Sequence, residues 1–258
     1  MPNTSKIKGR MKTIASTQKI TKAMKLVSLS KLQQYRSRMA SFDVYYDALA
    51  QANQSFIEFT HNDSDQDTIY LVFMPDLGLC SSYTNGMLKY LKPLLKSNDL
   101  VLSVGTQHYE LFKNQGLNIV NELLSSEKFD LEDIVMRISE YTKSHKIVAV
   151  VPSYRGVTLS FNLEALETQA KQGRDDAIYD PSFEEASQKL IDLALIALVQ
   201  NTFFQSKVSE HTTRRIAMEK ATDSAQEMLD DLGREYNRIR QEAITQEIAE
   251  IVSGMEGV

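Results

Sequence analysis

The chain has 258 residues, of which 42% are hydrophobic and 24% are charged, a composition typical of a soluble protein of one or two domains. It holds no apolar run near the ~20 residues that a membrane-spanning helix needs, and its basic N-terminal segment lacks the apolar core of a secretory signal. The single cysteine excludes an internal disulfide, and the four histidines are too scattered for a zinc spacing.

Charge is distributed very unevenly along the chain. Residues 1–42 hold ten Lys or Arg and no Asp or Glu, whereas the whole chain has a net charge of −5, which leaves −15 for the remainder. A solvated helix face normally interleaves both signs, because i,i+4 pairs stabilise it. A solvated helix face is the usual explanation of a run of charges, but the absence of any acid weakens it here. The alternative is a partner of opposite charge, namely nucleic acid, an anionic membrane or an acidic protein surface.

Helix breakers are confined to the middle of the chain. Residues 10–74 contain neither Pro nor Gly, and after Pro181 the only Gly before the extreme end is Gly233. This distribution predicts two long helices around a compact insert.

The first helix is predicted over about residues 5–59, a length of roughly 80 Å, and the polar stretch 61–67 (HNDSDQD) ends it. An apolar seam at spacings of four and three residues follows Ile7, Met11, Ile14, Leu32, Tyr35, Met39, Phe42, Tyr46, Leu49 and Phe56. Inside the basic segment, the same seam lands on polar residues, namely Gln18, Thr21, Lys25 and Ser28.

The middle of the chain alternates predicted strands and helices, which is typical of a mostly parallel α/β sheet. Strands are predicted at 68–74, 99–105 and 146–154, with a weaker one at 117–123 and an edge strand at 156–163. Helices are predicted at 81–95, 106–116 and 131–144. The segment 76–82 (DLGLCSS) has one glycine, and no phosphate-binding glycine motif occurs. We therefore expect a scaffold without a cofactor.

No catalytic constellation stands out. Cys80 has no supporting spacing to His108 or His145, and a lone cysteine beside a strand is usually a small buried hydrophobic residue. The segment 168–177 is predicted to be a mobile loop. The acidic pairs are read as solvated, namely Asp175–Asp176, Glu184–Glu185 and Asp230–Asp231.

The last helix is predicted to begin at Pro181, with a capping box made by Ser182 and Glu185 and a possible break near residues 201–207. Its seam follows Ala221, Ala225, Met228, Leu232, Tyr236, Ile239 and Ala243, and then Ile244, Ile248 and Ile251. Two long helices at opposite ends of one chain, each with an apolar seam, predict an antiparallel coiled coil. The expected division is 1–60 and 181–258 for the coiled coil and 67–180 for a Rossmann-like α/β domain.

Two long motifs resemble the gamma subunit of F-type ATP synthases. They are IKGRMKTIASTQKITKAMKLVSLSKL near the N-terminus and RRIAMEKATDSAQEMLDDLGREYNRIRQEAITQEIAEIVSG near the C-terminus, with the shorter GLC (78–80) and SEH (209–211) between them. The middle departs from the family, because Leu77 stands in place of an arginine and Ser81 and Ser82 in place of glycines. The paired cysteines of light-regulated members are also absent.

The resemblance implies the fold predicted above and a mechanical role. The chain would be the non-catalytic central shaft of a rotary ATP synthase, turning inside a ring of alpha and beta subunits and coupling ion flow to ATP synthesis or hydrolysis. The epsilon subunit and the membrane ring of c subunits would contact the α/β domain and the foot of the coiled coil. No nucleic acid, cofactor, metal or direct membrane insertion is implied, and the location would be the cytoplasmic face of the cell membrane, as a peripheral subunit.

The resemblance also assigns ring-facing residues by motif position: Lys19, Lys22, Met24, Lys25, Arg214, Arg240, Gln241, Thr245 and Glu250. For the polar stretch of the seam, we expect a stutter in which Ile20, Ala23, Met24 and Val27 hold the partner helix. Lys19, Lys22, Lys25 and Lys31 would then be free to face acidic parts of the ring.

Two alternatives remain at this stage. One is a gamma-like shaft of a diverged ATPase that only hydrolyses ATP or pumps sodium. The other is a coiled-coil adaptor whose basic arm binds nucleic acid or acidic lipid. The first 34 residues contain no aromatic residue, which disfavours nucleic acid.

Overall fold

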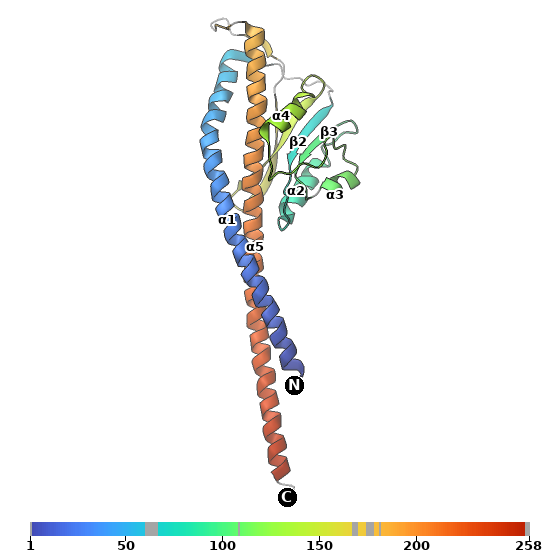
Figure 1. Ribbon diagram of the computed structural model, residues 1–258, viewed down its shortest axis with the longest axis vertical. Coiled ribbons are helices and arrows are strands. Elements are labelled where there is room, and N and C mark those ends of the chain that lie inside the picture. Colours follow the sequence, from blue (N-terminus) through green and yellow to red (C-terminus); the bar gives the residue numbers. More distant parts are fainter. Residues whose placement is uncertain are drawn as a thin grey trace. The chain divides into compact units, whose positions relative to one another are not determined.

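The structure is a computed structural model that describes residues 2–59, 67–107, 109–166, 170–173, 178–180 and 182–255. The breaker at 61–66, His108, Pro181 and the acidic pair at 175–176 lie outside these residues. The elements in chain order (Figure 1) are α1 (Pro2–Phe56), β1 (Ile57–Phe59), β2 (Thr68–Phe73), α2 (Ser81–Leu91), β3 (Leu100–Val104), α3 (Tyr109–Asn114), α4 (Leu131–Ser139), β4 (Lys146–Arg155), β5 (Thr158–Ala165), β6 (Ala170–Gly173) and α5 (Phe183–Met255).

The chain forms two compact units, which are described separately. The helix-pair unit consists of Met1–Leu29 and Arg214–Val258, and the sheet unit consists of Ser30–Thr213. The two long helices contribute to both units, because α1 and α5 each run without interruption from one into the other.

The sheet unit is built on a four-stranded sheet of order β3-β2-β4-β5. β2 pairs in parallel with both β3 and β4, and β5 pairs antiparallel with β4. β2 and β4 are apolar on both faces, as expected of strands that are covered on both sides. The predicted α/β sheet with an edge strand is thereby confirmed.

Helices cover both faces of this sheet. Alternate strand residues such as Tyr70 and Val148 pack toward α2 and α3, whereas Leu71 and Ala149 pack toward α4 and toward the parts of α1 and α5 that belong to this unit. Because α2 and α4 lie on opposite faces, the parallel strands form a doubly wound, Rossmann-like arrangement.

Residues 117–123 do not form the weak strand that was predicted. This segment makes one isolated bridge, between Ile119 and Val101, and the next residue, Leu124, makes another with Val104. Between these two bridges, the side chain of Asn121 bonds to β3 in place of a strand backbone. Its Oδ1 accepts from the Ser103 N–H at 2.8 Å and its Nδ2 donates to the Ser103 carbonyl at 2.8 Å. A side-chain amide carries the donor and acceptor of a peptide group, so it satisfies the edge of β3 without a regular strand.

The ends of the long helices differ in detail from the prediction. α1 ends at Phe56, because residues 57–59 form β1, which pairs antiparallel with β6 inside the segment predicted to be a loop. α5 begins after Ser182, whose Oγ accepts from the Glu185 N–H at 3.3 Å, which is one of the two bonds of the predicted capping box.

The break suggested near residues 201–207 is absent, since α5 is continuous. Two of its polar residues, Asn201 and Lys207, find partners outside the helix. Asn201 donates to Glu164 at 3.3 Å, and Lys207 is buried in ion pairs. Polar residues in this stretch therefore mark packing against the sheet, and they do not interrupt the helix.

Candidate functional site: the paired ends of the long helices

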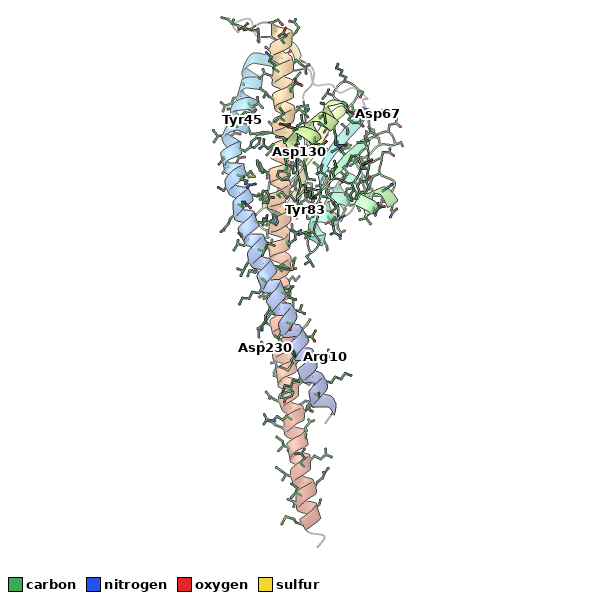
Figure 2. The ribbon with its side chains drawn as sticks, in the orientation of Figure 1. Arg10, Tyr45, Asp67, Tyr83, Asp130 and Asp230 are labelled. Atoms are coloured by element: carbon green, nitrogen blue, oxygen red, sulfur yellow. The ribbon has the colours of Figure 1, made fainter. Side chains whose placement is uncertain are left out.

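In the helix-pair unit, α1 and α5 run antiparallel and side by side, as Figure 2 shows near Arg10 and Asp230. Polar residues lie inside this seam. Thr21 and Thr222 share a hydrogen bond of 2.8 Å between their hydroxyls, and Gln18 donates to Gln226 at 2.9 Å. Ser28 is only 2% exposed. The original seam therefore continues through the polar stretch.

The stutter hypothesis is wrong. Ile20 and Val27 are 60% and 62% exposed, and Ala23 is exposed as well, so these residues do not hold the partner helix. The seam tolerates threonine because the single proton of each hydroxyl has two acceptors within reach, namely the other hydroxyl and a carbonyl of its own helix. The Thr21 hydroxyl lies 3.0 Å from the Gln18 carbonyl, and the Thr222 hydroxyl lies 2.7 Å from the Met218 carbonyl. A satisfied hydroxyl is far less unfavourable to bury than an unpaired one.

Replacing Thr21 or Thr222 alone with valine is expected to destabilise the helix pair by about 1 kcal/mol, because one hydroxyl loses its partner across the seam. The double replacement is expected to restore most of that loss, because no hydroxyl is then left without its partner. Urea unfolding of the four proteins of this cycle measures the coupling. Purely additive effects would show that the two hydroxyls act independently.

The predicted ring-facing residues on α1 have different surroundings. Lys19 and Lys22 are exposed, whereas Met24 and Lys25 are half-buried. Lys25 donates to Glu219 at 2.6 Å, and this hydrogen bond lowers the pKa of Glu219. Lys25 is therefore paired inside the chain, contrary to the expectation that it is free.

On α5, Arg214 was predicted to face a neighbouring subunit. Its side chain is buried instead, with only 4% exposed. The other four predicted residues, Arg240, Gln241, Thr245 and Glu250, are all exposed. Their surface is available for contact.

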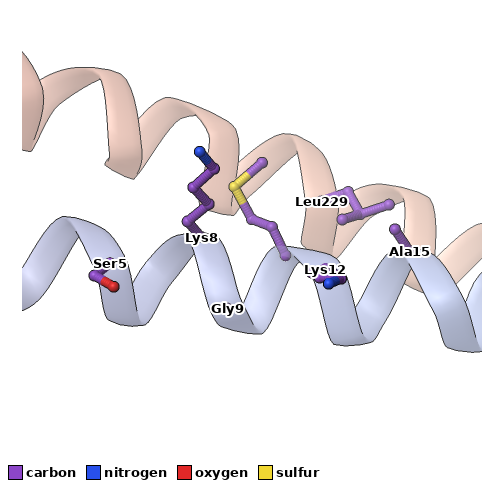
Figure 3. Close-up of a pocket in the computed structure, with 7 residues that line it drawn as sticks. Ser5, Lys8, Gly9, Lys12, Ala15 and Leu229 are labelled. Carbon is purple, nitrogen blue, oxygen red and sulfur yellow. The ribbon is translucent and has the colours of Figure 1, made fainter.

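The seam on α5 includes Leu229, because Met228 points outward and is exposed. Leu229 lines a shallow groove with residues of α1 (Figure 3): Ser5, Lys8, Gly9, Met11, Lys12 and Ala15. Beyond this region, α5 continues past the start of α1, as Figure 1 shows. Its end carries an exposed apolar stripe of Ile244, Ile248, Ile251, Val252 and Met255. An apolar stripe of this kind indicates a surface that a partner covers.

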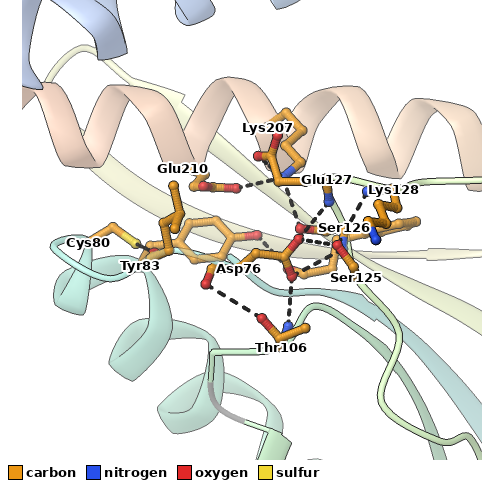
Figure 4. Close-up of polar contacts among 12 residues, drawn as sticks. Asp76, Cys80, Tyr83, Thr106, Ser125, Ser126, Glu127, Lys128, Lys207 and Glu210 are labelled. Atoms are coloured by element: carbon orange, nitrogen blue, oxygen red, sulfur yellow. Dashed lines mark hydrogen bonds and ion pairs between the residues drawn. The ribbon is translucent and has the colours of Figure 1, made fainter.

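A second polar cluster lies in the sheet unit (Figure 4). The ammonium of Lys207 donates to Ser126 at 2.9 Å and to Glu127 and Glu210 at 3.1 Å each. Burial lowers the pKa of Lys207, but the carboxylates of Glu210 and Glu127 outweigh it, so the net pKa is raised. Glu127, Glu210 and His211 are close enough to hold a metal, yet Lys207 already supplies the cation between the two carboxylates.

Asp76 shapes the loop that presents Glu127. Its carboxylate accepts from the Ser125 hydroxyl at 2.6 Å and from the N–H groups of Thr106 and Glu127 at 2.8 and 2.6 Å. Burial raises the pKa of Asp76, but these hydrogen bonds more than offset it and the net pKa is lowered. Asp76 and Thr106 follow the carboxyl ends of β2 and β3, where α/β domains bind ligands. In this chain, the carboxyl ends of β2 and β3 lie next to the ion pairs of Lys207 with Glu127 and Glu210.

The comparisons with known proteins decide the family. A model of the ATP synthase family matches residues 3–258. The chain belongs to the ATP synthase gamma chain family. The ATP synthase gamma chain of Mycoplasmopsis synoviae is 31% identical over 287 residues, covering 99% of both chains, and that of Clostridium kluyveri is 30% identical over 275 residues, covering 98% of this chain and 97% of the relative.

Solved structures share the fold. A chain from the Euglena gracilis mitochondrial ATP synthase, in an assembly of OSCP, F1 and c-ring, superimposes with a TM-score of 0.75 at 17% identity, covering 99% of this chain and 94% of that one. A chain of the rotor of the same enzyme gives 0.72 at 15% identity, covering 94% and 99%. The resemblance drawn from the two terminal motifs is thus confirmed. The relatives are named ATP synthase gamma chains, so the predicted family is the one that the comparisons show.

Gamma-chain motifs located the helix pair, but sequence reasoning missed the Lys207 cluster. The motif SEH contains Glu210, which pairs with Lys207, and this motif was the one signal in the sequence that pointed to the cluster. In the motif GLC, Leu79 has a positive φ of 65° and Cys80 is buried, so this segment forms a tight turn before α2. Among the described residues, no helix is both long and apolar enough to cross a membrane.

Proposed function

We propose that this gamma chain turns inside the ring of alpha and beta subunits and couples ion flow to ATP synthesis or hydrolysis. The observation that carries the proposal is the family match over residues 3–258, together with the exposed apolar stripe at the end of α5, which extends past the start of α1 (Figure 1). Rotation and ring conformation are then linked states, so that each drives the other.

The basic face of α1 supplies the electrostatic part of this contact. Lys19 and Lys22 are exposed beside the exposed apolar residues Ile20 and Val27. A surface that mixes lysines with apolar side chains suits an acidic, partly apolar partner, because lysine stems pack on apolar surface while their ammonium groups pair with carboxylates. Lys25 contributes to this face only if its pair with Glu219 opens.

The remaining partners are proposed on the family pattern. The epsilon subunit and the membrane ring of c subunits contact the α/β part of the sheet unit and the nearby helices. The subunit lies at the cytoplasmic face of the cell membrane, held there by the complex. The solved relatives are chains of F1/c-ring, rotor and central stalk assemblies, which supports this arrangement.

Replacing Lys19 and Lys22 together with glutamate is expected to leave the chain folded, because exposed substitutions usually change stability by no more than ~0.5 kcal/mol. In the reconstituted complex, ATP-driven ion pumping per ATP hydrolysed is expected to fall several-fold, because like charges then face each other. The matched control is the double arginine variant, which keeps both charges. Normal pumping by the glutamate variant, with a full subunit complement, would count against a ring-facing role.

A further inference from the structure

Within the sheet unit, α5 lies against the α/β part (β2 to β5 with α2 to α4) at the place where many α/β domains hold a ligand. The chain passes from β2 to β3 on one side and then to β4 on the other, so the strand order reverses at β2. The crevice at the carboxyl ends of such strands is the usual binding site. Here the buried Lys207 of α5 occupies this region and donates to Ser126 and Glu127, on the loop between β3 and α4 (Figure 4).

β4 bonds to a different side of α5 through its backbone. Pro152 stands opposite a residue of β5, but its carbonyl points away from β5, because backbone groups alternate in direction and the Leu166 N–H donates to Ile147 at 2.9 Å. The register of β4 with β2 ends before this point. The buried Ser209 hydroxyl of α5 donates to the Pro152 carbonyl at 3.3 Å. A side chain of α5 therefore satisfies a backbone group of the sheet.

A second bond joins α5 to β4 on the same side. The hydroxyls of Tyr154 and Thr213 lie 2.7 Å apart. The Thr213 hydroxyl donates to the Ser209 carbonyl at 2.8 Å, so the Tyr154 hydroxyl is the donor of the bond to Thr213. Thr213 is buried, as Ser209 is.

The two sets of contacts leave α5 in widely different directions. In an α-helix, Lys207 and Ser209 project about 160° apart around the axis, and Lys207 and Thr213 about 120° apart. Both sets nevertheless end on the same α/β part. A rotation of α5 about its own axis relative to the sheet therefore strains bonds on both sides of the helix.

The groups that hold α5 are themselves fixed in place. Pro152 and Tyr154 belong to β4, and the loop that carries Glu127 is held by the Asp76 carboxylate. The apolar side chains that α5 packs on the sheet, such as Phe203, add cohesion. The hydrophobic effect is non-directional, so it opposes separation more than rotation, whereas a hydrogen bond weakens when its atoms are misaligned.

We propose that these contacts form a clamp that transmits twisting force between α5 and the α/β part of the sheet unit. The clamp consists of Lys207 with Ser126 and Glu127 on one side, and of Ser209 and Thr213 with Pro152 and Tyr154 on the other. The proposal rests on the proposed function, because a rotating stalk has to carry such a force. In this role, the clamp residues act by fixing the angle of α5.

The neutral side of the clamp allows a matched pair of variants. Tyr154→Phe with Ser209→Ala removes two hydroxyls whose bonds, of 2.7 and 3.3 Å, join α5 to β4. The control is Tyr109→Phe with Ser160→Ala, which removes two hydroxyls with bonds of the same lengths to backbone carbonyls inside the α/β part. We expect the two double variants to lose similar stability in urea unfolding, because each loses the same kinds of hydrogen bond.

The first readout uses the isolated chain. Spin labels are attached to cysteines that replace Met136 of α4 and Leu193 of α5, which are 61% and 40% exposed, whereas the natural Cys80 is buried. The distribution of distances between the two labels, measured by pulsed electron paramagnetic resonance, is expected to broaden in the clamp variant. In the control variant, we expect the distribution of the wild-type chain.

The second readout uses the chain assembled with its alpha and beta subunits. The ring is fixed to a surface, hydrolysis is stalled, and a probe on the cysteine at position 136 reports the angular fluctuations of the α/β part. The variance of these fluctuations is expected to rise about twofold in the clamp variant, because one of the two directional sides is lost. The control variant is expected to match the wild-type chain.

The outcomes separate the clamp from the proposed function and from a general loss of stability. Equal fluctuations in the clamp and control variants would overturn the clamp, whether both match the wild-type chain or both are wider. A wild-type probe that does not rotate when ATP is supplied, or a wild-type chain that does not enter the ring, would contradict the proposed function. The label distances in the isolated chain would still decide whether α5 is clamped. If the double variants do not fold, Tyr154→Phe and Tyr109→Phe alone give the same comparison.

Discussion

Replacing Lys207 with alanine is expected to lower the free energy of unfolding by about 3–5 kcal/mol, because it leaves a buried carboxylate without its partner. The Lys207 side chain is 2% exposed and bridges Glu210 on the same helix to Glu127 on the loop shaped by Asp76. The variant removes the ammonium but keeps Glu210 in a site with little access to water. Urea unfolding of the isolated chain, followed by circular dichroism, measures the loss.

A matched control is Arg234→Ala, which removes the cation of the exposed pair with Asp231 and is expected to change stability little. The double variant Lys207→Met with Glu210→Gln should recover part of the loss, since neither of these two buried positions then carries a charge. A loss below about 1 kcal/mol for Lys207→Ala would mean that water reaches Glu210 and that the cluster is not a buried ion pair.

Replacing Arg240 and Gln241 together with alanine is expected to lower the ATP turnover of the assembled complex about tenfold or more, since charge-assisted contacts contribute about 1.5–3 kcal/mol each. Both side chains are exposed on α5, one and two residues beyond the half-buried Ile239 of the seam. They therefore project from the helix pair, where a loop of the surrounding ring is proposed to meet them. Steady-state hydrolysis by the reconstituted ring complex measures the effect.

The control for this variant lies near the start of the same helix. Gln188 and Lys189 are also an exposed amide and cation, and their double replacement with alanine removes a similar set of groups. Both proteins are expected to keep the helicity of the wild-type chain. Equal turnover in the two variants would leave Arg240 and Gln241 as ordinary surface residues.

The sequence predicted the architecture well because its signals were strong. Long stretches without Pro or Gly predicted both helices, and the apolar runs before α2 and after α4 predicted β2 and β4. Burial on both faces requires continuous apolar sequence, so these strands were easy to recognise. The edge strand β5 was also predicted, because turn residues separate it from β4.

The failures concern polar residues whose partners lie far away in the sequence. The seam was expected to shift away from Thr21 and Ser28 because apolar character was taken to define it, yet both residues are buried in it, and the Thr21 hydroxyl lies within hydrogen-bond distance of the Gln18 carbonyl. Asn121 was read as part of a strand, although its side chain does the pairing. A helix break was suggested near residues 201–207, whereas Lys207 is part of a continuous helix and finds Ser126 and Glu127 some eighty residues earlier in the sequence. No local pattern reveals such partners.

The helix pair joins residues that lie at opposite ends of the chain, and this constrains the order in which the protein folds. Gln18 and Gln226 are separated by 208 residues, so forming this contact first would close a very large loop. Within the sheet unit, however, Tyr35 of α1 already stacks on His211 of α5. Once that unit has formed, each further contact between the helices closes only a short additional loop. We therefore expect the sheet unit to fold first and slowly, and the helix pair to form quickly afterwards, from the sheet unit toward the two termini. During synthesis, a chain that still lacks the residues of α5 cannot form the helix pair.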